Sequence, residues 1–100
     1  MKKFIMTAGI VAITSASIAA HAYTGEYMAE QAKITIRQAR AIALKAYPGK
    51  ITDEELEKEK GGSGLRYSFD ISKAGHEHEV GVDAKTGKVL ENSREQTDAD

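Results

Sequence analysis

Apolar and polar residues alternate along two stretches of the chain, residues 65–72 and 76–83. Side chains of a strand point alternately to its two faces, so this pattern predicts two β-strands with one buried face each. The side chains expected on these faces are Leu65, Tyr67, Phe69 and Ile71, and then His76, His78, Val80 and Val82. Lys73-Ala74-Gly75 lies between the stretches and is typical of a turn, which predicts an antiparallel hairpin.

Residues 35–47 follow a helical pattern instead. The residues expected on the buried side, three or four positions apart, are Ile36, Ala39, Ile42, Ala43, Ala46 and Tyr47. Thr35 and Gln38 have the spacing of a capping box at the start, and Pro48 and Gly49 end the helix. The alanine-rich side predicts a helix that lies close against a sheet.

The segment 51–60 is ambiguous. Its Glu, Leu and Lys residues favour a helix by propensity, whereas its apolar residues fit neither the helical nor the strand period. It lies between the helix stop and the glycine-rich turn at 61–64, so we predict a bulged strand there. Its many charges suit a sheet edge, where they deter aggregation.

A second hairpin is predicted within 80–90. Asp83 can accept hydrogen bonds from the amides of the next two or three residues, and Gly87 can take the positive φ that a short turn requires. The last strand is expected at 88–93, with Val89 facing the core.

These elements predict an α+β fold, in which one N-terminal helix packs on a three- to four-stranded antiparallel sheet as a two-layer sandwich. The opposite sheet face is left to water. We expect the domain to span 34–93, with a flexible leader at 23–33 and a disordered tail at 94–100. The chain has no cysteine, so stability must come from one core of modest size.

The first 22 residues are predicted to be a secretory signal peptide. Lys2 and Lys3 precede an apolar run over 4–20, and Ala20-His21-Ala22 supplies the small residues of a cleavage site before Tyr23. The alternative is a membrane anchor, but the run is short and diluted by polar residues. We therefore expect a periplasmic or secreted protein with no stable anchor after cleavage.

The charge balance narrows the class of partner. Removal of 1–22 takes two of the 14 basic residues and none of the 15 acidic ones, which leaves a net charge of −3. A mixed, mildly acidic surface argues against nucleic acid, which requires a clustered basic face. Nothing in the sequence fixes the oligomeric state.

No residue is predicted to be catalytic or to bind a cofactor or metal. Two groups of side chains are candidates: the carboxylates Glu54, Glu55, Glu57 and Glu59, and the pair His76 and His78. The carboxylates suit a solvated edge better than acid–base catalysis, because so small a unit offers no deep cleft. The two histidines share one strand face and could chelate a transition metal, but a dedicated site usually has more ligands.

The ordered set of motifs resembles the PepSY domain family over roughly residues 34–91. It consists of a capped helix ending in Ala46-Tyr47-Pro48-Gly49, the acidic strand with Glu55-Leu56-Glu57, a Tyr-bearing strand, and Val82-Asp83-Ala84-Lys85-Thr86-Gly87-Lys88-Val89-Leu90. PepSY domains occur in propeptides of thermolysin-like metallopeptidases and as small free-standing bacterial proteins. The resemblance implies a helix against an antiparallel sheet, no established catalytic residues, and a role in binding or restraining peptidases.

The function expected from this resemblance is that of a secreted, non-catalytic protein-binding module, with a peptidase as the implied partner. The alternative is an envelope metal-binding or stress-responsive protein that uses His76 and His78. His78 stands where many relatives carry an aromatic residue, which keeps this alternative open.

Overall fold

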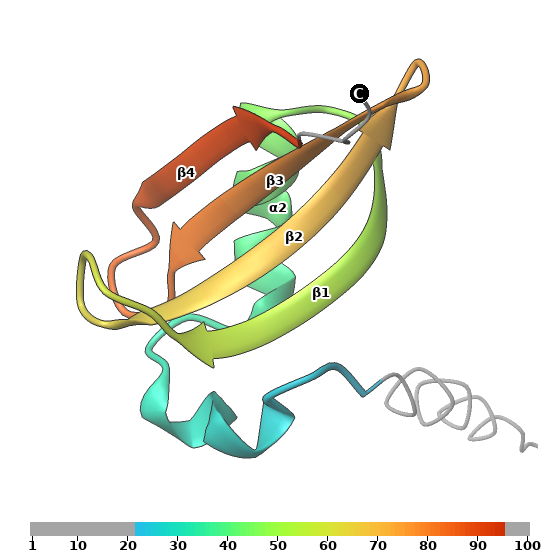
Figure 1. Cartoon of the computed structure of the whole chain (residues 1–100). Helices are drawn as coiled ribbons and strands as arrows, with labels where there is room; N and C mark the ends of the chain where they lie inside the picture. The colour runs from blue at the N-terminus through green and yellow to red at the C-terminus, as the bar shows by residue number, and fades with distance from the viewer. Residues whose placement is uncertain (1–21, 96–100) are drawn as a thin grey trace, which may run out of the picture.

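Residues 22–95 of the computed structural model are described; the predicted signal sequence up to residue 21 and the end of the predicted tail, 96–100, lie outside them. The sheet has the strand order β1-β2-β3-β4, with every neighbouring pair antiparallel. The elements are η2 (Glu26–Gln31, a 3-10 helix), α2 (Ile36–Ala46), β1 (Lys50–Lys58), β2 (Leu65–Lys73), β3 (His76–Asp83) and β4 (Val89–Arg94). Helix α2 lies across one face of the sheet, which confirms the predicted α+β fold and fixes the strand number at four (Figure 1).

Helix α2 begins and ends where its sequence predicts. The Thr35 side chain accepts from the Gln38 amide at 3.1 Å, and the Gln38 side chain accepts from the Thr35 amide at 2.9 Å. Ala39 and Ala43 are completely buried against the sheet. Because alanine has only a methyl side chain, the helix axis can approach the sheet closely at these positions.

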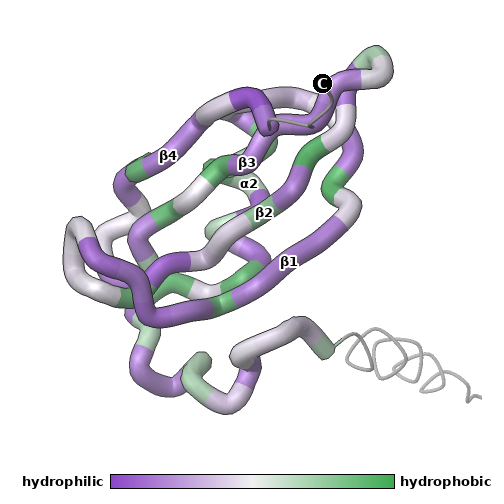
Figure 2. The backbone as a smooth tube through the Cα atoms, viewed as in Figure 1, coloured by the Kyte–Doolittle hydropathy of each residue, from purple (hydrophilic) through white to green (hydrophobic). Residues whose placement is uncertain are grey.

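The core lies between α2 and the sheet, and its residues are those of the alternating pattern. Hydrophobic and hydrophilic positions alternate along the strands (Figure 2). Tyr67, Phe69, Ile71, Val80 and Val82 are all 1% exposed or less. Burial raises the pKa of Tyr67 to about 12, and its hydroxyl donates to the Ile34 carbonyl at 3.0 Å.

The ambiguous segment after the helix is indeed a bulged strand. The pairing of β1 with β2 shifts between Ile51 and Asp53, so that Thr52 is the extra residue. Thr52 turns its hydroxyl toward Glu77, to which it donates at 2.8 Å. Beyond the bulge, Leu56 pairs with Tyr67 and is buried in the core.

The segment 23–33, expected as a flexible leader, carries the 3-10 helix η2 and lies against the sheet. Met28 is 6% exposed and belongs to the core, and the Leu56 amide donates to the Thr24 carbonyl at 2.7 Å. One buried methionine in a six-residue 3-10 helix produces no hydrophobic periodicity, so the sequence pattern gave no sign of an element here.

Val89 is on the predicted core side of the sheet, which it shares with its partner Val82, but it is not part of the buried core. Val89 pairs with Val82 but is 37% exposed, whereas Val82 is fully buried. Strand β4 is an edge strand, and its register shifts between Gly81 and Val82. An edge strand has a neighbour on one side only, which leaves this side chain open to water.

Asp83 ties the two loops at one end of the sheet together. Its carboxylate accepts from the Ser63 amide and hydroxyl, both at 2.7 Å, from the Lys85 amide at 2.8 Å and from the Thr86 amide at 3.2 Å. Burial by itself would raise its pKa, but these hydrogen bonds outweigh burial and hold the pKa at about 2. The predicted bonds to the following amides are confirmed, and Ser63 is an additional partner from the other loop.

Candidate functional site

The face of the sheet opposite α2 is the largest feature that the fold leaves uncovered by any described element (Figure 1). Residues paired across neighbouring strands share a face, so the strand register identifies the side chains of this outer face. One cross-strand row is Asp53, Asp70 and Glu79, in which three carboxylates stand directly opposite one another. The other carboxylates that the register places on the outer face are Glu55, Glu57, Glu77, Asp83 and Glu91.

Burial and the charges of neighbouring carboxylates raise the pKa of two of these groups, Asp70 and Glu79. Burial is the largest cause for Asp70, followed by the charges of Glu95, Asp53 and Glu77. For Glu79 the largest cause of the raised pKa is again burial, followed by the charges of Glu91 and Asp70 among others. Like charges placed opposite one another in a sheet are destabilising. The outer face therefore holds a charge arrangement that works against the stability of the domain.

Arg66 neutralises only one end of this face. It is 9% exposed, and its guanidinium donates to the Lys60 carbonyl at 3.0 Å and lies 3.5 Å from Glu91. Its side chain crosses over Gly81, where a Cβ would come within 2.8 Å of the arginine Cδ. Glycine at position 81 is thus required for this crossing. The row of Asp53, Asp70 and Glu79 lies farther along the strands and forms no ion pair with any Lys or Arg among residues 22–95.

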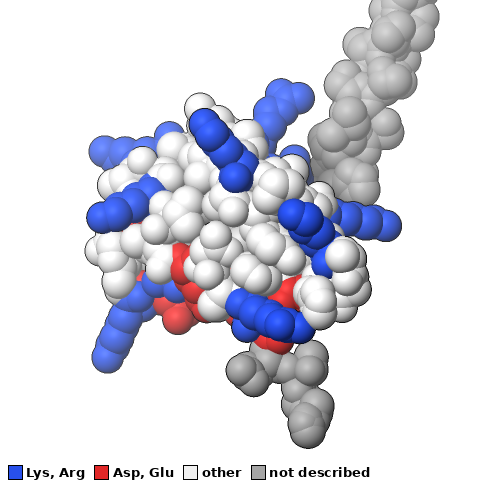
Figure 3. Space-filling model, turned by 90° about the horizontal axis from the view of Figure 1, so that it is seen from above, with Lys and Arg blue, Asp and Glu red and all other residues white. Residues whose placement is uncertain are grey.

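Charge is unevenly distributed over the surface. Seen from above, most of the visible surface is uncharged, Lys and Arg side chains project at separate points around it, and acidic side chains are seen only toward the lower part of the view (Figure 3). Helix α2 contributes to this separation, since it carries Arg37, Arg40 and Lys45 and no acidic residue. The acidic outer face and the basic helix lie on opposite sides of the sheet.

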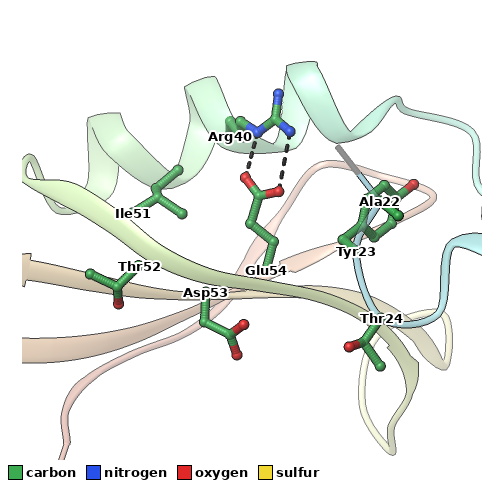
Figure 4. A pocket seen from close by; sticks show the side chains of 8 residues that line it. All are labelled: Ala22, Tyr23, Thr24, Arg40, Ile51, Thr52, Asp53 and Glu54. Atoms are coloured by element: carbon green, nitrogen blue, oxygen red, sulfur yellow. Dashed lines mark hydrogen bonds and ion pairs between the residues drawn. The ribbon is translucent and has the colours of Figure 1, made fainter. Parts of the chain in front are cut away.

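A groove opens along the free edge of β1 (Figure 4). It has a volume of about 920 Å³. Its lining residues are Ala22, Tyr23, Thr24, Arg40, Ile51, Thr52, Asp53 and Glu54. Arg40 of α2 and Glu54 of β1 point toward each other and form a two-pronged ion pair, with Nη2 to Oε1 at 3.1 Å (Figure 4). The hydrogen bond to Glu54 raises the pKa of Arg40. The groove therefore contains a fixed charge pair and an exposed strand edge.

The candidate carboxylates do not form one site. Glu54 points to the helix side and binds Arg40, while Glu55 and Glu57 stand on the outer face. Glu57 accepts from the Ser68 hydroxyl at 2.8 Å, and Glu59 lies exposed after the end of β1. The sequence identified these residues as a solvated acidic edge. It missed the rows that they form with β2 and β3, because strand register cannot be obtained from one strand alone.

His76 and His78 lie at the end of β3 among cations. His78 stacks on Tyr47 with ring centroids 3.7 Å apart, and the Lys73 ammonium lies 5.6 Å from the centre of the same tyrosine ring. His76 Nδ1 is 2.7 Å from an Arg94 guanidinium nitrogen. Positive groups this close disfavour a bound metal cation. In residues 22–95, no three His, Asp or Glu side chains are grouped so as to hold a metal ion. Metal binding by the histidine pair stays the alternative to the prediction that no residue binds a metal.

The fold and the uncovered face together define a small α+β unit, in which one helix covers one side of a four-stranded antiparallel sheet. The family described as peptidase propeptide and YPEB domain matches residues 33–92. The chain belongs to this family, PepSY. No curated protein and no solved structure gives a significant match to the chain. Within the part of the chain that the structure describes, no helix has the length and apolar character needed to cross a membrane.

Proposed function

We propose that the protein is an exported, non-catalytic binding module of the bacterial envelope that regulates a peptidase partner. The PepSY match supports a regulatory or binding role, since the family is that of peptidase propeptides. The sequence before Tyr23 supports export, because it has the charged start, apolar run and small-residue cleavage site of a signal peptide.

The observation that carries the proposal is the uncovered acidic face of the sheet. Asp53, Asp70 and Glu79 are held opposite one another at a cost to stability. Local arrangements that oppose folding are typical of functional surfaces, where a partner supplies what the fold lacks. Here a partner with basic side chains would relieve the repulsion, and complementary charge would also speed and orient the encounter.

The described residues support a binding role better than catalysis. Ser63 and Ser68 each hydrogen-bond a carboxylate, to Asp83 and Glu57, and no histidine is within hydrogen-bond reach of either in residues 22–95. The serine–histidine contact of a hydrolase is therefore missing from this part of the chain.

The experiment combines capture with an activity measurement. The mature chain from Tyr23 is immobilised and exposed to envelope extract, and a thermolysin-like metallopeptidase is assayed with the free domain in excess. We expect a captured peptidase and slower proteolysis in its presence. No captured peptidase together with unchanged proteolysis at high excess would refute the proposal.

A matched pair of variants tests the role of the outer face. Asp70→Asn with Glu79→Gln removes two charges from the carboxylate row, and Glu26→Gln with Glu30→Gln removes two exposed charges from η2. The first variant should capture less peptidase and slow proteolysis less, and the second should leave both effects unchanged. Equal losses in the two variants would show that only net charge matters.

A further inference from the structure

We propose that the edge of β1 that does not pair with β2 binds an extended strand of the partner in place of Thr24 and Gly25, and that the side chains of this strand are basic at alternate positions. This inference rests on the proposed function and deepens it by naming the mode of binding and the chemistry of the bound segment. Strand addition to a sheet edge is a general mode of peptide recognition, in which backbone hydrogen bonds give affinity and alternate side chains give specificity.

The edge of β1 already accepts an extended segment of this chain. Thr24 pairs with Glu55 as a parallel bridge, and the Leu56 amide donates to the Thr24 carbonyl at 2.7 Å. Alternate residues of a strand direct their backbone groups to the same edge, so those of Glu54 and Lys58 face it as well. The bulge at Thr52 limits regular pairing to Asp53–Lys58. This six-residue edge is thus contacted by an isolated bridge rather than by a full strand. Gly25 also lies against the Leu56 carbonyl, where a Cβ would come within 1.8 Å of the oxygen, so an added strand has to displace Thr24 and Gly25.

Two grooves flank the Thr24 contact along this edge. The groove with Arg40 and Glu54 lies on one side (Figure 4). The second has a volume of about 480 Å³. Its lining residues are Thr24, Gly25, Tyr27, Met28, Gln31, Glu55, Leu56, Glu57 and Lys58. Tyr27 is 82% exposed here although it is a large aromatic residue. An added strand would find space for its side chains in both grooves and an aromatic ring to pack on.

The outer side of β1 fixes the charge of the incoming strand. Asp53, Glu55 and Glu57 stand at alternate positions on the outer face. Residues directly opposite in neighbouring strands interact, and opposite charges there are stabilising. Burial and the neighbouring Glu57 and Asp53 carboxylates raise the pKa of Glu55, so this position already has excess negative charge. The complementary strand therefore carries Lys or Arg at every second residue.

The same geometry favours basic side chains over a metal ion as the counter-charge. No group of three carboxylates or histidines in the described residues 22–95 is arranged to hold a metal ion. Asp53, Glu55 and Glu57 instead follow one another along a strand at the two-residue repeat, about 6.6 Å from one to the next. A second strand has the same repeat and can meet each of these carboxylates in turn.

The first experiment separates strand addition from simple charge attraction. The mature chain is titrated with a short peptide of alternating Lys and Val, and with the same peptide N-methylated at alternate residues on its pairing edge. We expect the methylated peptide to bind at least about tenfold more weakly, because it cannot donate backbone hydrogen bonds to β1. Equal affinity of the two peptides, or no binding of either at millimolar concentration, would overturn the inference.

Hydrogen exchange then locates the bound peptide. The unmodified peptide should slow exchange of the Glu54 and Lys58 amides, which face the edge, by about tenfold or more. Protection that appears instead at β4, or nowhere in the sheet, would contradict the assignment of β1.

A matched pair of variants tests the charge pattern. Glu55→Lys reverses a charge beside the β1 edge, and Glu95→Lys makes the same change of net charge next to β4, where the Glu95 amide donates to the Glu77 carbonyl. Glu55→Lys should lower the affinity for the Lys–Val peptide about tenfold, and Glu95→Lys should lower it much less. A Glu–Val peptide should instead bind the Glu55→Lys variant better than the unchanged protein. Equal effects at the two positions would show that net charge alone determines peptide affinity, which would contradict the assigned charge pattern.

The outcomes also distinguish this inference from the proposed function. If the Glu55→Lys variant still captures and slows a peptidase while the peptide fails to bind β1, the proposed function is supported and strand addition is refuted. If the peptide binds β1 as expected but no peptidase is captured or slowed, the edge is a strand-binding site and the peptidase role falls.

Discussion

Two carboxylates on the same face of strand β3, Glu79 and Asp83, have opposite environments. Asp83 accepts four hydrogen bonds from Ser63, Lys85 and Thr86, and its pKa falls to about 2. Glu79 stands opposite Asp70 in the register, and burial together with neighbouring carboxylates raises its pKa.

The difference shows which carboxylates serve the fold. The donors around Asp83 are backbone amides and a hydroxyl of two loops, so the carboxylate stabilises the folded state and its position is fully determined from within the chain. Glu79 and Asp70 receive no comparable internal donors among the described contacts, and their charge opposes folding. A carboxylate that the fold does not need is available for a partner.

The largest effect is expected at Asp83. Asp83→Asn replaces an acceptor oxygen by an amide donor facing other donors, so the free energy of unfolding should fall by about 2–3 kcal/mol. Unfolding in denaturant measures this loss. Ser63→Ala serves as the milder comparison, with an expected loss of about 1 kcal/mol in the free energy of unfolding. A loss for Asp83→Asn no greater than that for Ser63→Ala would mean that the carboxylate does not hold the two loops together.

Much of the fold could be predicted because its signals are local. The capping box at Thr35, the stop at Pro48 and the alternation along β2 each act within a few residues. The contact of Asp83 with the Lys85 and Thr86 amides was predictable for the same reason. Its bond to Ser63 was not, because the two residues are brought together only when the hairpins pair.

The candidate site was less predictable. The acidic character of β1 is evident in the sequence, but the row of Asp53, Asp70 and Glu79 depends on a register that includes the bulge at Thr52. A shift of one residue would turn these side chains to the other face. The position of Thr24 on the β1 edge had no sequence signal at all, since it rests on one backbone bridge.

The carboxylates with lowered and with raised pKa values should change the stability with pH in opposite directions. Asp83 has a folded pKa of about 2, below its ordinary 3.8, so its contribution of about 2 kcal/mol is present above pH 4 and is lost as the pH falls toward 2. Glu55, Asp70 and Glu79 have raised folded pKa values, so protonating them stabilises the fold, and this gain is lost as the pH rises through those values.

The free energy of unfolding should therefore be greatest near about pH 4 and fall on either side. Thermal unfolding across the pH range measures this curve. Asp83→Asn should flatten the acid side and leave the other side in place. A curve that rises steadily to neutral pH would show that repulsion on the outer face is negligible.

The smallest effect is expected from relieving the outer face. Asp70→Asn with Glu79→Gln should raise the free energy of unfolding at neutral pH and low salt by about 0.5–1 kcal/mol, because two like charges no longer face each other. Salt screens repulsion between exposed charges, so this gain should shrink as the salt concentration rises. Glu26→Gln with Glu30→Gln, which removes the same charge from η2, should change stability little under either condition. If Asp70→Asn with Glu79→Gln were instead destabilising at low salt, these two carboxylates would belong with Asp83 as parts of the fold, and the case for the outer face as a partner surface would lose its physical basis.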